Sequence, residues 1–229
     1  MTGDEAERRH SRALEPELIT DPDIKAKAEA ANGLRQYDYA VQSVQTAIER
    51  KPFRLRPSFI LALQREALQG ISSYAGLFRP AAVEIQHSAH EPPGAHLVAE
   101  LVEDLCDYVN DHWESESAIH LAAYVMWRLN WIHPFADGNG RTSRSLSFCV
   151  LSIKLSSVLP GTPTLPELVI QHRADYEAAL DAADVAAREG LVDVSAMERL
   201  IEVLLAKQLA RVYEMARASG ASGSPLQSA

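Results

Sequence analysis

Most of the chain spaces its apolar residues as amphipathic helices do. The segment 32–50 repeats apolar residues every three or four positions, which predicts a helix with a single apolar stripe. The members of this stripe are Leu34, Tyr37, Val41, Val44 and Ile48. Comparable patterns recur at 56–70, 96–113 and 195–212, so the sequence predicts a mostly α-helical protein.

Two other segments, 118–132 and 145–155, are apolar on nearly every side. Helices of this kind are surrounded by protein, so both are expected at the centre of the fold. The short polar break between them is therefore expected to hold its functional groups close to the core.

One stretch, 74–96, does not fit the helical pattern. It is rich in proline and glycine and contains a short β-like run, Ala82–Ile85. This combination predicts a small β-hairpin or flap followed by a loop. The remaining irregular segments are the two ends of the chain, where polar and small residues predominate and disorder is expected.

Composition narrows the class of protein. Hydrophobic residues make up 47% of the 229 residues and charged residues 23%, as in soluble globular proteins. No apolar run is long enough to span a bilayer, and the N-terminal residues lack the apolar core of a secretory signal. The net charge of -9 argues against a nucleic-acid partner. Cys106 and Cys149 lie in apolar helical patterns, which favours buried thiols and a cytoplasmic location.

The polar break carries an anion-binding pattern. Gly138, Asn139 and Gly140 permit a tight turn whose backbone N–H groups point inward at the start of a helix, where the helix dipole attracts anions. Asn139 suits the N-cap position of that helix. Arg141 and Arg144 are three positions apart and so share one face, and guanidinium groups match phosphate oxygens. Together these residues indicate a polyphosphate site.

Two side chains beside this turn complete a catalytic set. Asp137 is an unfavourable neighbour for phosphates unless a cation lies between them, which predicts a Mg²⁺ ion held by one carboxylate, phosphate oxygens and water. His133 can take up a proton near neutral pH. The set fits attack of a hydroxyl group on a nucleotide phosphate. The P-loop pattern is absent, because no lysine follows the glycines and no strand precedes them.

The run HPFADGNGRTSR, residues 133–144, resembles the core motif of the Fic family, H-P-F-x-D/E-G-N-G-R-x-x-R, at every specified position. The resemblance implies a helical bundle with a small β-hairpin flap beside the active site. It also implies four parts of the chain. These are a disordered N-terminus at 1–20, an N-terminal helical extension at 21–55, a Fic-type catalytic domain at 56–207, and the end of a C-terminal helix with a disordered tail at 208–229.

The same resemblance implies a protein adenylyltransferase, which moves AMP from ATP to a Ser, Thr or Tyr hydroxyl of a target protein with Mg²⁺. His133 would then be the general base, Asp137 the Mg²⁺ ligand, and Arg141 a catalytic contact to the phosphates. The nucleotide would be bound by Gly138, Asn139, Gly140, Arg141 and Arg144.

The motif specifies the reaction more closely than it specifies the nucleotide that donates the transferred group. Relatives that act as kinases have lysine at the position of Gly140, so a glycine favours AMP transfer. Transfer from UTP, GTP or CDP-choline remains an alternative, as does a nucleotide-binding regulatory protein with little transfer activity.

The family resemblance also suggests partners and regulation. The flap near Ala82–Ile85 is expected to dock the target protein by strand addition. Many relatives carry an inhibitory helix with the pattern S/T-x-x-x-E-G/N, whose glutamate pairs with the last arginine of the motif. No complete match occurs here, and Glu29 is the candidate nearest in position. Regulation by a separate inhibitory protein, or through a homodimer, stays open.

Overall fold

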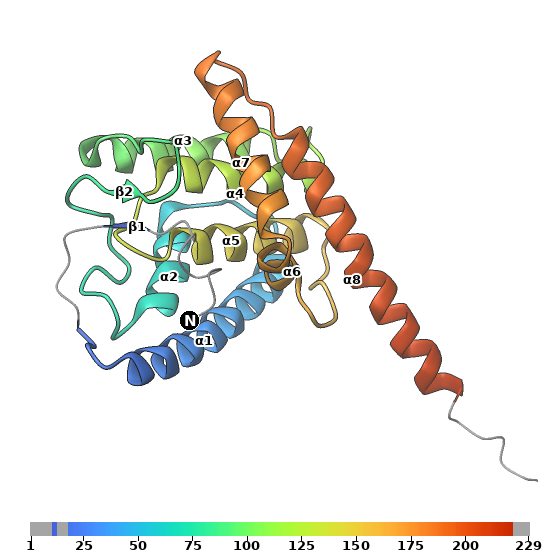
Figure 1. Ribbon diagram of the computed structural model, residues 1–229. Helices are drawn as coiled ribbons and strands as arrows, with labels where there is room; N and C mark the ends of the chain where they lie inside the picture. The colour runs from blue at the N-terminus through green and yellow to red at the C-terminus, as the bar shows by residue number, and fades with distance from the viewer. Residues whose placement is uncertain (1–10, 13–17, 222–229) are drawn as a thin grey trace, which may run out of the picture.

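Two buried helices form the centre of the fold, as their apolar patterns predict. They are α4 (Ala118–Ile132) and α5 (Asn139–Lys154), which pack against each other and are joined by a short loop (Figure 1). In this computed structural model the described residues are 11–12 and 18–221. Most of the predicted disordered ends, 1–10, 13–17 and 222–229, lie outside them.

The other helices surround this central pair. They are α1 (Pro22–Glu49), α2 (Pro57–Leu68), the 3₁₀ turn η1 (Ala95–Leu97), α3 (Val98–Asp111), α6 (Leu165–Gln171), α7 (Arg173–Arg188) and α8 (Ser195–Ala221). α1 and α2 pack on α5, whereas α3, α7 and α8 pack on α4 (Figure 1). The predicted mostly α-helical fold is confirmed. Among the described residues, no helix is both long enough and apolar enough to traverse a bilayer.

α1 begins ten residues before the predicted start at residue 32. Asp21 caps it by accepting hydrogen bonds from the backbone N–H groups of Asp23 and Ile24 at 2.9 and 3.0 Å, and Pro22 occupies the first turn. The helix packs directly on α2 and α5, so the predicted N-terminal extension shares the core of the other helices.

The predicted apolar stripe of α1 is only partly buried. Val44 is fully buried and Val41 and Ile48 pack against the core, whereas Leu34 is 70% exposed. The buried side of the helix continues instead through Asn32, Gln36 and Ala40. The two amides are buried because each meets a backbone carbonyl. Asn32 donates to Gln69 at 2.8 Å and Gln36 donates to Leu63 at 3.0 Å. These contacts place a polar pair where apolar periodicity alone predicts leucine and tyrosine.

The predicted flap contains a short strand, β2 (Glu84–Ile85), at the end of the β-like run. Its partner is β1 (Ser11–Arg12), an antiparallel strand from far earlier in the chain (Figure 1). Ser11 pairs with Ile85 and Arg12 with Glu84. The β ladder is thus formed between the N-terminal segment and the flap. The described partner of β2 is therefore a distant strand and not the second strand of a local hairpin.

Candidate active site

A cavity of about 670 Å³ lies at the N-terminal end of α5. All of the predicted site residues line it. They are His133, Asp137, Gly138, Asn139, Gly140, Arg141 and Arg144. The remaining walls come from α1, the flap around Ile85, the end of α4, Ile170 of α6 and one side of α7. The structure therefore brings the whole predicted set together and adds groups from several distant segments.

The loop before α5 is folded by two left-handed residues and one amide. His133, at the end of α4, has φ 51°, and Gly138, the residue before α5, has φ 82°. The side chain of Asn139 spans the loop: its Oδ1 accepts from the N–H of Phe135, and its Nδ2 donates to the carbonyl of Phe135, both at 2.9 Å. Asn139 was expected as the N-cap, but Gly138 holds that position and Asn139 is the first helical residue. The amide thus fixes the loop rather than capping the helix.

Gly138 is required by both its conformation and its surroundings. Its positive φ is unfavourable for residues with a side chain. A Cβ at this position would also lie 2.5 Å from the Cδ2 atom of Leu68, which is fully buried. The backbone at the start of α5 is therefore closely packed on α2, with the opposite side left open to the cavity.

The ring of His133 is held in a defined tautomer. Its Nδ1 lies 3.1 Å from the carbonyl oxygen of Asn130, so Nδ1 carries the proton and Nε2 carries the lone pair. Burial lowers the pKa of His133 to about 4, with smaller contributions in the same direction from Arg79 and His90. The carbonyl of Asn130 and the carboxylate of Asp137 act in the opposite direction. At neutral pH the ring is a neutral base.

Asp137 and Arg141 form an ion pair inside the motif. Arg141 donates through Nη2 to Oδ2 of Asp137 at 3.0 Å, and the backbone N–H of Gly138 donates to Oδ1 at 2.5 Å. On its other side, Nη1 of Arg141 lies 3.9 Å from the carboxylate of Glu29 on α1. Glu29 is thus placed in the cavity against Arg141, although the family pattern pairs the inhibitory glutamate with the last arginine of the motif.

The donor set is compatible with one hard cation shared with a ligand. The carboxylate of Asp137 is half exposed to the cavity, and each of its oxygens has a second lone pair beyond the hydrogen bond it accepts. Within the described part of the chain, no three His, Cys, Asp or Glu side chains are grouped as metal ligands. An ion such as Mg²⁺ commonly binds to one carboxylate together with phosphate oxygens and water.

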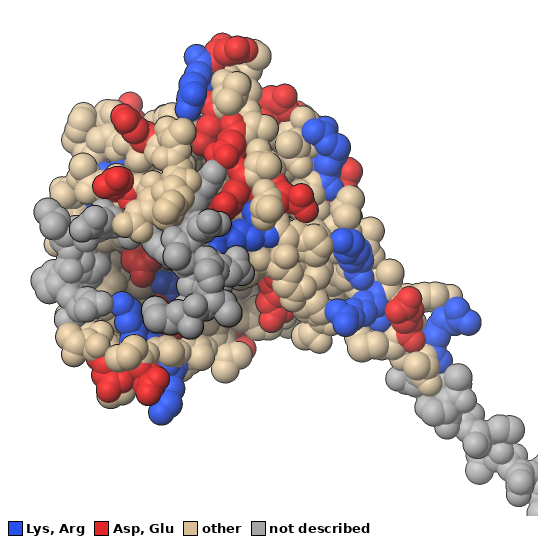
Figure 2. Space-filling view, viewed as in Figure 1, with Lys and Arg blue, Asp and Glu red and all other residues tan. Residues whose placement is uncertain are grey.

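The charges around the cavity are mixed rather than uniformly basic. Cationic side chains come from Lys25, Arg141, Arg144 and Arg173. Acidic side chains gather along α7 beside this region (Figure 2), and Arg173 pairs with Glu177 on that helix at 2.8 Å. Two of the four cationic side chains, Arg141 and Arg144, come from the beginning of α5.

Two residues that hold the site in place were missed by the sequence analysis. Arg79 is 3% exposed and donates through Nε to the carbonyl of His133 at 2.8 Å and through Nη1 to Ala81 at 2.9 Å. Its Nη2 donates to the carbonyl of Pro93. Gln64 of α2 donates to the carbonyl of Asp137 at 3.1 Å. The sequence offered one signal for Arg79, which is a single arginine within an apolar and irregular stretch.

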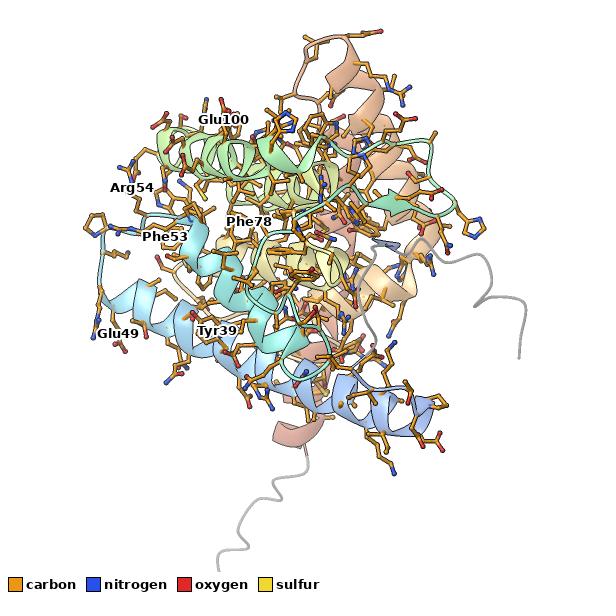
Figure 3. The ribbon with its side chains drawn as sticks, turned by 90° about the vertical axis from the view of Figure 1, so that its left-hand side faces the viewer. Tyr39, Glu49, Phe53, Arg54, Phe78 and Glu100 are labelled. Atoms are coloured by element: carbon orange, nitrogen blue, oxygen red, sulfur yellow. The ribbon has the colours of Figure 1, made fainter. Side chains whose placement is uncertain are left out.

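The flap is joined to the loop between α4 and α5 by packing as well as by Arg79. Phe78, labelled in Figure 3, packs against Phe135 of this loop, with ring centroids 6.0 Å apart. The backbone N–H of Arg79 donates to the carbonyl of Pro134 at 2.9 Å. The base of the flap and this loop therefore form one packed unit.

Comparison with known proteins identifies the same region. Residues 54–151 match the Fic/DOC family. Over 117 residues the chain is 33% identical to protein adenylyltransferase Fic from Drosophila persimilis, and over 115 residues it is 35% identical to protein adenylyltransferase fic-1 from Caenorhabditis briggsae. These alignments cover 50% and 49% of this chain, but only 22% and 18% of the relatives. The chain thus spans about a fifth of the length of the curated relatives it matches.

Solved structures share the fold. A fragment of Fic-1 from Caenorhabditis elegans superposes with a TM-score of 0.65 at 23% identity, covering 87% of this chain and 55% of that one. A Fic family protein from Desulfovibrio desulfuricans gives a TM-score of 0.59 at 20% identity, over 79% of this chain and 53% of the other. The structural likeness extends beyond residues 54–151 to most of the helices.

Proposed function

The chain carries a domain of the Fic/DOC family at residues 54–151, and on that premise we propose that it is a protein adenylyltransferase, which transfers AMP from ATP to a hydroxyl group of a target protein. One observation carries the proposal. His133, Asp137 and the two motif arginines line a single cavity at the N-terminus of a buried helix. The names of the curated relatives, protein adenylyltransferases from flies and nematodes, support the same activity.

The proposed step is a displacement at the α-phosphorus of ATP. Nε2 of His133 takes the proton of a Ser, Thr or Tyr hydroxyl, and the hydroxyl oxygen forms a bond to the α-phosphorus. The bond between that phosphorus and the oxygen bridging to the β-phosphate breaks, and pyrophosphate leaves with the bonding electrons. Arg141, Arg144 and the N–H groups at the start of α5 bind phosphate oxygens and stabilise the charge that develops on them.

We assign Asp137 as the protein ligand of a Mg²⁺ ion bound together with the nucleotide. Such an ion neutralises phosphate charge. In the structure Oδ2 of Asp137 accepts a hydrogen bond from Arg141, so a cation held at that oxygen would compete with the ion pair. Arg141 would then contact the phosphates through its guanidinium.

Gly140 leaves room for Arg144 at the start of α5. A Cβ at this position would lie 3.0 Å from Nη1 of Arg144, so the guanidinium would have to move by a few tenths of an ångström. In the family that the motif resembles, the relatives that act as kinases carry lysine at this position. Glycine therefore favours ATP bound with its α-phosphate at the acceptor.

The identity of the donor is tested by a nucleotide panel. The protein is incubated with Mg²⁺, a cell lysate and each α-³²P-labelled nucleoside triphosphate in turn, with labelled CDP-choline as a further donor. Protein-bound label from ATP, exceeding that from UTP, GTP and CDP-choline, is expected. Stronger label from another donor would identify a different transferase, and ATP binding without any label would favour a regulatory protein.

The low pKa of His133 predicts that kcat/KM changes little as the pH falls from 7.5 to 5.5. A histidine with the ordinary pKa of 6.5 would lose about tenfold in its basic form between pH 7.5 and 5.5. Because burial lowers the pKa of His133 to about 4, the basic form stays populated throughout this range. We expect kcat/KM for ATP at saturating target protein to change by less than about twofold between these pH values. A tenfold fall at pH 5.5, with the protein still folded by circular dichroism, would contradict the assignment.

We propose that a target segment docks on the edge of β2, at Glu84–Ile85. The pairing of this edge with Ser11–Arg12 supports the proposal, because it means that the edge accepts an extended segment through main-chain groups. Ile85 also lines the cavity that holds His133, so a segment paired there lies beside the base. A target that uses this edge has to replace β1.

Proline substitutions on the two strands are therefore expected to act in opposite directions. Replacing Ser11 and Arg12 together with proline removes the N–H groups that β1 can donate, which frees the edge and lowers the KM for the target protein. Replacing Glu84 and Ile85 with proline is expected to raise that KM. Leu18→Pro, outside the strand, serves as the control. Equal KM values for all variants in steady-state transfer assays would contradict docking at this edge.

Glu29 is expected to weaken nucleotide binding modestly. Its carboxylate lies 3.9 Å from Arg141 and competes with phosphate oxygens for that guanidinium. Both side chains are partly exposed, so Glu29→Gln is expected to tighten ATP binding by no more than about fivefold. Calorimetric titration with ATP measures the change. Glu49→Gln, at the opposite end of α1 (Figure 3), is the matched control, and a weaker affinity in Glu29→Gln would contradict the role.

A further inference from the structure

The side chain of Asn130 lies where three helices meet. Asn130 is one helical turn before His133 on α4, and its Nδ2 lies 2.7 Å from Oγ of Ser143 on α5 and 2.9 Å from the hydroxyl of Tyr176 on α7. The carbonyl of Met126 is a third acceptor, at 2.6 Å. An amide has two N–H groups, so the three acceptors share two donors. One side chain thus links α4 to both α5 and α7.

The link to α5 continues into the anion-binding turn. Ser143 is fully buried and donates from Oγ to the carbonyl of Gly140 at 3.0 Å. A chain of hydrogen bonds therefore leads from Asn130 to Ser143 and on to Gly140. Because Gly140 lies in the first turn of α5, this chain of hydrogen bonds restrains the N–H groups proposed to bind phosphate.

The link to α7 continues to the last arginine of the motif. The hydroxyl of Tyr176 accepts from Asn130, and both Tyr176 and Arg144 line the cavity. Burial lowers the pKa of Arg144, and the neighbouring Tyr176 opposes that effect by favouring the charged form. A hydroxyl oxygen can accept two hydrogen bonds, so Tyr176 can serve both donors at once.

We propose that Asn130 and Tyr176 are positioning residues that hold Arg144 and the first turn of α5 in the arrangement that binds the nucleotide phosphates. The inference rests on the proposed function, because it concerns the nucleotide site of that reaction. The contact of Asn130 with His133 is made by its main-chain carbonyl and survives substitution of its side chain. Loss of the side chains is therefore expected to weaken phosphate binding and to leave the titration of His133 unchanged.

The test is a double-mutant cycle on ATP affinity. The dissociation constant of ATP with Mg²⁺ is measured by calorimetry, without target protein, for wild type, Asn130→Ala, Tyr176→Phe and the double variant. Each single substitution is expected to weaken binding by about tenfold, the effect of a hydrogen bond to a charged group. The double variant is expected to bind ATP only slightly less tightly than whichever single variant has the lower affinity, because both residues restrain the same guanidinium. The pH dependence of kcat/KM is expected to stay as in wild type.

Two matched controls separate positioning from stability. Asn110→Ala removes an amide that bonds both the N–H and the carbonyl of Leu55, away from the cavity, and Tyr39→Phe removes a hydroxyl on α1. Both are expected to bind ATP as wild type does. Tyr176→Phe keeps the ring that packs in the core, so this variant reports on the hydroxyl even if Asn130→Ala does not fold.

Three results would overturn the proposal. ATP affinities within twofold of wild type in both single variants would show that the network does not position the site. Losses that multiply in the double variant would show that the residues act independently. Absence of ATP binding by wild type would reject the network and the proposed function together. If wild type binds ATP but transfers no AMP, the proposed function fails alone and the cycle still tests the network.

Discussion

His133→Ala is expected to reduce the rate of AMP transfer by about 10²–10⁴-fold, the usual contribution of a general base. Three features of the structure lead to this expectation. The ring lines the cavity, its Nδ1 proton is engaged by the carbonyl of Asn130, and its low pKa keeps the lone pair on Nε2 at neutral pH. None of these features concerns ATP affinity, so the dissociation constant of ATP is expected to stay close to that of wild type.

Single-turnover transfer with saturating ATP measures the loss, because it separates the chemical step from nucleotide binding. His96→Ala, an exposed histidine in η1, is the matched control and is expected to react as wild type does. A His133→Ala protein that keeps more than about a tenth of the wild-type rate would assign the base to another group.

Arg79→Met is expected to produce the largest loss of stability, on the order of 3 kcal/mol. The guanidinium donates to the carbonyls of His133, Ala81 and Pro93 from a buried position. Methionine retains the apolar stem but leaves these acceptors without a donor. Lysine has no planar fork and is expected to rescue only part of the loss. Since one of the acceptors belongs to His133, the variant is also expected to transfer AMP more slowly.

Urea unfolding measures the change in free energy, provided that the m value stays constant. Arg65→Met is the control, because this side chain is 55% exposed and pairs with its neighbour Glu66. Its effect is expected to stay within about 0.5 kcal/mol. A free energy of unfolding for Arg79→Met within 1 kcal/mol of wild type would show that the flap is held to the loop between α4 and α5 by other contacts.

The candidate site could be predicted because its residues are nearly contiguous. Twelve successive positions, 133–144, supply the base, the carboxylate, the glycines and both arginines, and local geometry brings them together. The two central helices were predictable for a similar reason, since their apolar character on all sides is a local property. Both predictions depend on short-range sequence, where spacing alone determines which side chains share a face.

The features that were missed depend on contacts between distant segments. Asn32 and Gln36 are buried because carbonyl groups in the middle of α2 and at its C-cap accept their hydrogen bonds, and periodicity carries no information about those carbonyls. Arg79 lies 54 residues before its acceptor His133. The partner of β2 comes from the N-terminal segment. In each case a polar group is satisfied by tertiary packing, which a pattern of apolar positions does not encode.

Comparison of two labels on ATP tests the central claim most directly. Parallel reactions contain α-³²P-ATP or γ-³²P-ATP, Mg²⁺ and a cell lysate, with His133→Ala as the inactive control. Kinases of the lysate transfer γ-label in every reaction, so the comparison is made on the protein-bound label that is lost in His133→Ala. Attack at the α-phosphorus predicts that this His133-dependent label comes from α-³²P-ATP only, because the γ-phosphate leaves in pyrophosphate. His133-dependent label from γ-³²P-ATP would instead show phosphoryl transfer and would contradict the account.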